Sequence, residues 1–267
     1  MSGTHDSAAL AEARGIDTSG PVAAFEHGLS VLTLALLTLL PIVEIVLRRF
    51  DSGVPGGTAF VQHLTLVVAL LGGALAARDD RLLALATGSL LPAGPVAIAA
   101  RGLAGFVGAA VSGLLARSGV DMVRLERATG RNITEGVPVW AFQVLLPLGF
   151  AVITWRIVKA AFGSHRAAGV LAAVGAVVGW WLGAGLPFDW ASPFSAVADQ
   201  AASAVLPGGP GSYTWWLLAL FVGAVAGAPI FALLGGAAAV MFLSEGVPGT
   251  AILIQTYQLS TKPTLAS

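Results

Sequence analysis

The sequence predicts an all-α integral membrane protein, a helical bundle of about six transmembrane helices with one or two interfacial helices. Of its 267 residues 56% are hydrophobic and only 10% are charged, whereas soluble domains carry about 25% charged residues. Several uncharged runs are long enough to cross the roughly 30 Å hydrocarbon core of a bilayer. The 34 glycines favour close helix packing in lipid, where small residues let backbones approach one another.

The clearest span is residues 136–155, GVPVWAFQVLLPLGFAVITW, which are twenty residues without a charge. Trp140 and Trp155 lie near its two ends, and tryptophan is typical of membrane interfaces. Five further spans are expected. The last of them is 29 residues long, so a tilt or a bend at 227–229 would have to absorb its excess length. These five lie at about 22–47, 58–77, 96–116, 167–186 and 215–243.

The segments between the spans are more polar. Residues 82–91 are apolar but short, and we expect an interfacial helix there. Residues 117–132 form the most charged segment, which we interpret as a loop or a helix lying on the membrane surface. Residues 187–212 contain no Lys or Arg and face a basic cluster at 156–166, so the positive-inside rule places this loop outside. The polar residues 1–21 then form a cytoplasmic tail, and without a cleavage site the first span stays as an anchor.

Charged side chains near the span ends are the candidate partner contacts. Glu44 and Arg48 are four residues apart and can pair on one helix face. The basic segment 117–131 could help to dock a soluble protein by charge complementarity, and a solvated surface helix is the equal alternative. The candidate contacts are Glu44, Arg48, Arg124, Arg127 and Arg131.

Other polar residues have simpler interpretations. His63 lies near the start of its span, where a helix-bonded or interfacial histidine is favoured over a proton relay. Arg101 is expected to extend to the interface rather than to bind an anion. Asp79 and Asp80 lie between two arginines, which indicates a solvated cluster rather than acid–base chemistry.

Composition also limits the function classes. The net charge is zero, with 14 basic and 14 acidic residues, so no nucleic-acid partner is implied. The absence of cysteine rules out disulfides, thiolate metal sites and a cysteine nucleophile. The four histidines lack metal-ligand spacing, and no nucleophile-elbow motif occurs. We therefore expect no catalytic residues, no metal and no cofactor, and the chain is not predicted to be an enzyme.

Three stretches resemble one family of membrane proteins. IVEIVLRRF ends the first span, TLVVALLGGALAAR fills the second, and VPVWAFQVLLPLGF opens the fourth. Together they resemble the small membrane subunit of tripartite ATP-independent periplasmic (TRAP) transporters over residues 22–162. A second stretch, GAPIFALLGGAAAVMFLSEGVP at 227–248, resembles the first span of the large TRAP membrane subunit.

This resemblance implies a domain organisation. Residues 22–162 are expected to form the four-helix small-subunit domain. Residues 163–212 would supply a connecting transmembrane helix and a periplasmic loop. Residues 213–267 would be the truncated start of a large-subunit-like domain, because the large subunit of the family continues much further.

The resemblance also implies a function. It indicates a non-catalytic membrane subunit for uptake of organic acids, often dicarboxylates, driven by an ion gradient across the cell inner membrane. The implied partners are the large membrane subunit, a soluble periplasmic substrate-binding protein and the lipid bilayer. Two other classes stay open, namely a structural membrane anchor of another complex and an intramembrane enzyme. The enzyme would need convergent polar groups at mid-depth, whereas here nearly all charges lie at span ends.

Overall fold

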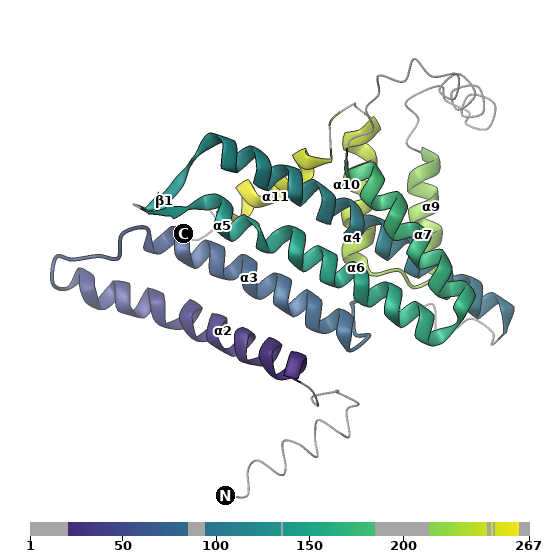
Figure 1. Ribbon diagram of the computed structural model, residues 1–267, viewed down its shortest axis with the longest axis horizontal. Helices are drawn as coiled ribbons and strands as arrows, with labels where there is room; N and C mark the ends of the chain where they lie inside the picture. The colour runs from purple at the N-terminus through teal and green to yellow at the C-terminus, as the bar shows by residue number, and fades with distance from the viewer. Residues whose placement is uncertain are drawn as a thin grey trace, which may run out of the picture.

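A computed structural model describes residues 21–84, 94–134, 136–184, 214–244, 247 and 249–261. Within these residues the chain is almost entirely helical (Figure 1), which confirms the all-α prediction. Five helices are long and apolar enough to cross a membrane: Ala23–Arg48, Gly57–Arg78, Pro95–Thr129, Val139–Ser164 and Arg166–Gly183. The expected polar tail, the loop at 187–212 and most of the expected interfacial helix at 82–91 lie outside the described residues.

The first two helices form an antiparallel pair. Helix α2 (Pro21–Arg48) and helix α3 (Gly57–Arg78) agree with the predicted spans to within a few residues. Helix α2 packs mainly on α3, along the lower edge of the bundle in Figure 1. Most of its large apolar side chains therefore stay exposed, for example Val31 and Ile45. This exposure is expected of a helix whose outer side faces lipid.

Helix α4 (Pro95–Thr129) is the central element, since it contacts α5, α6, α7, α9, α10 and α11. The predicted loop or surface helix at 117–132 is wrong, because α4 continues without a break through the charged segment to Thr129. Pairing between Arg117 and Asp121, one turn apart, is compatible with helix rather than loop. Gly130, in the left-handed conformation at φ 67°, then ends the helix.

The stretch 136–155 is not one uninterrupted helix. It begins with strand β2 (Val137–Pro138), which pairs with β1 (Asn132–Thr134) in an antiparallel hairpin. A short helix, α5 (Val139–Gln143), follows, and α6 (Leu145–Ser164) then carries the chain back along α4. The span as a whole runs from Val139 to Ser164, so the predicted span at 136–155 lies in the right place but begins three residues early and ends nine residues early.

Helix α7 (Arg166–Gly183) packs against α4 along a glycine seam. A Cβ atom at Gly175 would lie 2.4 Å from the carbonyl oxygen of Phe106, and one at Gly179 would lie 1.8 Å from that of Ala110. A Cβ at Gly183 would likewise lie 2.5 Å from the Leu114 carbonyl oxygen. The four-residue spacing of these glycines lets the two backbones touch, which is how helices adhere where lipid offers no hydrophobic drive.

The expected span at 215–243 is divided. Helix α9 (Thr214–Val225) and helix α10 (Ile230–Ser244) are joined by a turn at the predicted 227–229 position, but the chain reverses there instead of bending (Figure 1). A Cβ at Gly236 would lie 2.8 Å from Leu220, which only a hairpin allows. Gly227 takes the positive φ of 93° that the turn needs. At 12 and 15 residues, each arm is shorter than the roughly 20 residues of a full span.

The hairpin and the last helix complete the core. The amide of Ile230 donates to the carbonyl of Leu83, which fixes the hairpin turn to the segment after α3. Helix α11 (Thr250–Thr261) lies against α3 and α4. The main apolar core thus joins α4 and α6 to the C-terminal helices through the buried residues Val107, Val111, Leu114, Leu115, Met122, Leu146, Ala228, Ala232, Ala239, Ile252 and Leu253.

Candidate functional site

Two clusters of polar side chains lie at opposite ends of the bundle. The first, which we name the Glu26 cluster, consists of Glu26, His27, Arg78, Asp79 and Arg156. The second, the Glu126 cluster, consists of His63, Glu126, Arg131, Gln143 and Tyr257. Helix α3 connects the two, because it carries His63 near its start and Arg78 at its end.

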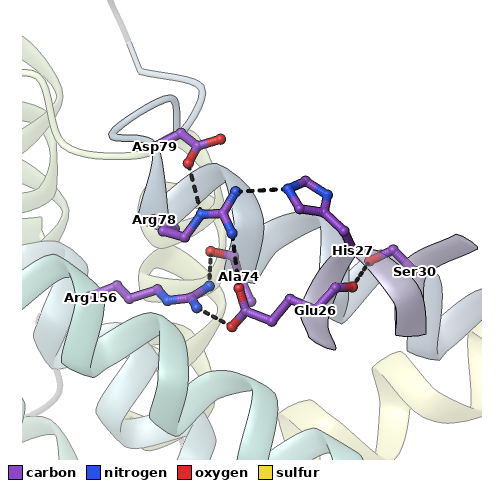
Figure 2. A network of polar contacts seen from close by, with 7 residues as sticks. All are labelled: Glu26, His27, Ser30, Ala74, Arg78, Asp79 and Arg156. Carbon is purple, nitrogen blue, oxygen red and sulfur yellow. Dashed lines mark hydrogen bonds and ion pairs between the residues drawn. The ribbon is translucent and has the colours of Figure 1, made fainter. Parts of the chain in front are cut away.

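The Glu26 cluster ties three helices together (Figure 2). The carboxylate of Glu26, from α2, lies between the guanidinium groups of Arg78 from α3 and Arg156 from α6. The Arg78 Nη1–Glu26 Oε2 distance is 3.3 Å, and Arg156 donates both to Glu26 Oε1 and, at 2.6 Å, to the carbonyl oxygen of Ala74. Arg78 also donates to Asp79 Oδ1 at 2.9 Å and contacts His27 Nε2 at 3.3 Å.

These charges are largely removed from solvent. The side chains of Arg156, Glu26 and Arg78 are 11%, 16% and 16% exposed. Two arginines face two carboxylates, so the cluster is neutral as a whole. Removing one member of such a buried pair typically costs about 3–5 kcal/mol, because an uncompensated charge remains. The cluster therefore holds the start of α2, a helix with few other buried contacts, onto α3 and α6.

The Glu126 cluster surrounds a buried carboxylate at the end of α4. Arg131 donates two hydrogen bonds to Glu126, at 2.6 and 2.5 Å, in the two-pronged geometry that suits a guanidinium. The same contact raises the pKa of Arg131 above its ordinary value. Thr129 donates to the carbonyl oxygen of Glu126 at 2.8 Å, and Gln143, fully buried in α5, approaches its carboxylate at 3.5 Å.

His63 links this cluster to the last helix. Its Nδ1 lies 2.6 Å from the carbonyl oxygen of Ala59, which can only accept, so Nδ1 carries the proton. In the neutral ring Nε2 is then an acceptor, and the Tyr257 hydroxyl donates to it at 2.6 Å. Burial raises the pKa of Tyr257, which keeps this hydroxyl protonated. Helix α11 is thereby fixed to α3 by a hydrogen bond between residues far apart in sequence.

Of the predicted partner contacts, all five lie in the described part of the chain. Glu44 and Arg48 form the expected pair within α2, at 2.7 Å. Arg124 pairs with Asp121 at 2.9 Å, Arg131 with Glu126, and the guanidinium of Arg127 lies 5.3 Å from the ring centre of Trp140. They share one end of the bundle, since Glu44 lies against Gly57, whose neighbour Gly56 lies against Ile133 in strand β1, which follows α4.

Three interpretations of polar residues can be compared with the structure. His63 is helix-bonded as predicted, and it is also 3% exposed and bonded to Tyr257, which the sequence did not indicate. Arg101 is exposed near the start of α4, and its position at the membrane interface stays a prediction. The solvated cluster at 78–81 is wrong for Arg78 and Asp79, whose side chains are 16% and 17% exposed, because Arg78 turns inward to Glu26.

The Glu26 cluster was not predicted from the sequence. Glu26 lies 52 residues from Arg78 and 130 from Arg156, so no local spacing connects them. The available signal was the acidic residue near the start of an otherwise apolar span together with Arg156, which comes directly after the uncharged fourth one. Charges in such positions need a partner within the bundle.

The fold and the two clusters define a helical membrane protein that is held together by packed small residues and by ion pairs near the ends of its helices. Within the described residues no group of three or more His, Cys, Asp or Glu side chains could hold a metal ion.

Residues 37–167 match the family model of tripartite ATP-independent periplasmic transporters, DctQ component. The chain therefore contains a domain of the DctQ family, the small membrane component of TRAP transporters. The match runs from the middle of α2 to the first residues of α7, within a few residues of the predicted end at 162. No curated protein and no solved structure matches the chain.

Proposed function

We propose that the chain acts as a helical brace in a TRAP-type secondary transporter, that is, as a rigid support for the moving parts of a large membrane subunit. The complex takes up organic acids such as dicarboxylates, driven by an ion gradient across the cell inner membrane. The substrate is delivered by a soluble periplasmic protein. The family assignment supports membership of such a complex.

The role as a brace is supported by the contacts that hold the helices of the bundle together. Helices α4 and α7 touch along their backbones at three successive glycines of α7. Helices α4 and α6 share the hydrogen bond from Thr154 to Ser112, at 2.9 Å, between the two polar clusters. Interhelical contacts near both ends of the bundle and in its middle favour a rigid body.

A docking surface is proposed at the end of the bundle that carries the Glu126 cluster. The side chains of Arg48, Arg124 and Arg131 are 70%, 67% and 67% exposed there. Guanidinium groups that are anchored by a carboxylate on one side and open on the other suit recognition of an acidic protein surface. We place this end outside, which puts the start of α2 inside.

The C-terminal helices are proposed to be the large-subunit-like part. Helices α9, α10 and α11 pack on α4, outside the stretch that matches the DctQ family. Under this proposal the core at Val107, Val111 and Leu115 is a contact between the small-subunit domain and a large-subunit-like segment within one chain.

The test is reconstitution. Purified chain in sealed vesicles with a sodium gradient is expected to move no organic acid, whereas vesicles that also hold a large TRAP subunit and its binding protein are expected to accumulate it. Uptake by the chain alone would place the transport site within it and refute the brace. A structural anchor of another complex would instead fail to co-purify with the large subunit.

The docking surface is tested separately. Replacing Arg48 and Arg124 by Glu is expected to weaken binding of the periplasmic protein and to steepen its loss with salt. Arg166→Glu, at an exposed position at the start of α7, is the matched control. Equal effects of the two sets of changes would contradict the assignment of the surface.

A further inference from the structure

An apolar groove of about 400 Å³ lies between α4, α6 and α7, away from both polar clusters. Three helices that are long enough to span the membrane supply its walls. The residues that line it are Gly113, Ala116, Ala151, Thr154, Trp155, Val158, Ala173, Ala176, Val177 and Trp180.

Small side chains on α4 and α7 leave this groove open. Where α6 turns into α7, the ring of Phe162 packs directly on Gly169. Further along, α7 and α4 offer mainly alanine and glycine, which are too small to fill the space between them and α6. The Thr154 hydroxyl lies 2.9 Å from the Ser112 hydroxyl and 2.7 Å from the carbonyl oxygen of Phe150, so its polar atom is satisfied within the helices and the wall it forms is effectively apolar.

One end of the groove meets a cation. Trp180 lines the groove, and the guanidinium of Arg117 lies 5.7 Å from the centre of its ring. Ala116 is the last residue of the apolar part of α4, so this end coincides with the start of the charged part. Asp121 is shared by Arg117 and Arg124, at 3.0 and 2.9 Å, which leaves two positive groups against one negative group.

We propose that this groove is a binding site for one anionic phospholipid. An acyl chain lies between α6 and α7, and the phosphate is bound by Arg117 beside Trp180. The net positive charge at one end of an apolar channel matches a lipid, which carries an anion at one end of a hydrocarbon chain. A purely apolar helix of a partner would fill the groove but leave that charge uncompensated. The proposal does not depend on the transport role.

The experiment is native mass spectrometry of the full chain in detergent, titrated with phosphatidylglycerol and phosphatidylcholine of equal chain length. Wild type is expected to retain phosphatidylglycerol preferentially. Arg117→Gln is expected to weaken that retention about tenfold, as for loss of a charge-assisted hydrogen bond, and to leave phosphatidylcholine unaffected. Ala173→Leu, which fills the groove, is expected to lower the retention of both lipids.

Matched controls sit away from the groove. Ala35→Leu adds the same bulk on the exposed face of α2, and Arg48→Gln removes another carboxylate-paired arginine. Both should retain lipid as wild type does. If Ala173→Leu does not fold, Ala151→Leu fills the groove from the opposite wall at an exposed position. Equal retention by wild type, the groove variants and the controls would mean non-specific annular lipid and would overturn the proposal.

Discussion

Replacing Gly179 by Ala is expected to destabilise the bundle by separating α4 from α7. The new methyl group would lie 1.8 Å from the carbonyl oxygen and 2.5 Å from the carbonyl carbon of Ala110. Both are backbone atoms, which cannot rotate away as a flexible side chain could. The two helices must therefore move apart until the contact distance reaches about 3.4 Å. This movement removes much of the dispersion energy between the side chains along the rest of the seam. We expect a loss of about 2 to 3 kcal/mol.

The measurement is unfolding of the purified chain in mixed micelles by titration with a denaturing detergent, followed by circular dichroism. Gly72→Ala is the matched control, because a Cβ there meets no atom within 4 Å. On helix propensity alone this control should be neutral or up to about 1 kcal/mol more stable.

Alanine substitutions at the glycines of the seam should destabilise the bundle to different degrees. A Cβ at Gly113 would lie 2.8 Å from the carbonyl oxygen of Ala176, a milder conflict than at Gly179. Gly113→Ala should therefore unfold between the control and Gly179→Ala. If Gly179→Ala and Gly72→Ala unfold at the same detergent fraction, the two helices are not in backbone contact and the seam does not hold the bundle.

Three further outcomes are expected. Glu26→Gln leaves the buried guanidinium of Arg156 without a carboxylate, whereas Arg78 keeps Asp79, and should cost about 3 kcal/mol; adding Arg156→Gln should recover part of this loss in a double-mutant cycle, and purely additive losses would contradict the pairing. Tyr257→Phe removes the hydrogen bond to His63 and should weaken the attachment of α11 by about 1 kcal/mol, read as faster hydrogen exchange confined to α11 and the start of α3; unchanged exchange in α11 would argue against the bond. A cysteine placed at Ser203 should react with a membrane-impermeant reagent in cells whose outer membrane is permeabilised, and labelling only after lysis would invert the proposed orientation.

The spans could be predicted because hydropathy and length are local properties. Residues 58–77 and 167–186 correspond to α3 and α7 within a few residues for this reason. The Glu44–Arg48 pair could be predicted from its spacing of four alone. By contrast, α4 was expected to end near Ala116, because charge was read as a loop signal. Charge ends the apolar part of a helix but not the helix itself, and Gly130 is the residue that stops it.

The clusters and the hairpin could not be predicted in the same way. Composition indicated glycine-mediated packing, but which glycines meet which carbonyl groups depends on the rotation of α7 against α4. Nothing local distinguishes a bend at Gly227 from a full reversal, because the reversal is decided by packing of α10 on α9 and of Ile230 on the segment after α3. Likewise the partner of His63 is contributed by a helix 194 residues further along the chain.

The unequal lengths of α4 and α7 have a consequence for the surrounding bilayer. Helix α4 has 35 residues, roughly 52 Å at 1.5 Å per residue, whereas α7 has 18, roughly 27 Å. The extra length of α4 is its charged segment after Ala116, which stays outside the hydrocarbon, and α7 is locked beside the apolar part of α4 by its glycines. Helix α7 is the shortest of the five long apolar helices in the described part of the chain, so local thinning of the lipid is expected beside it.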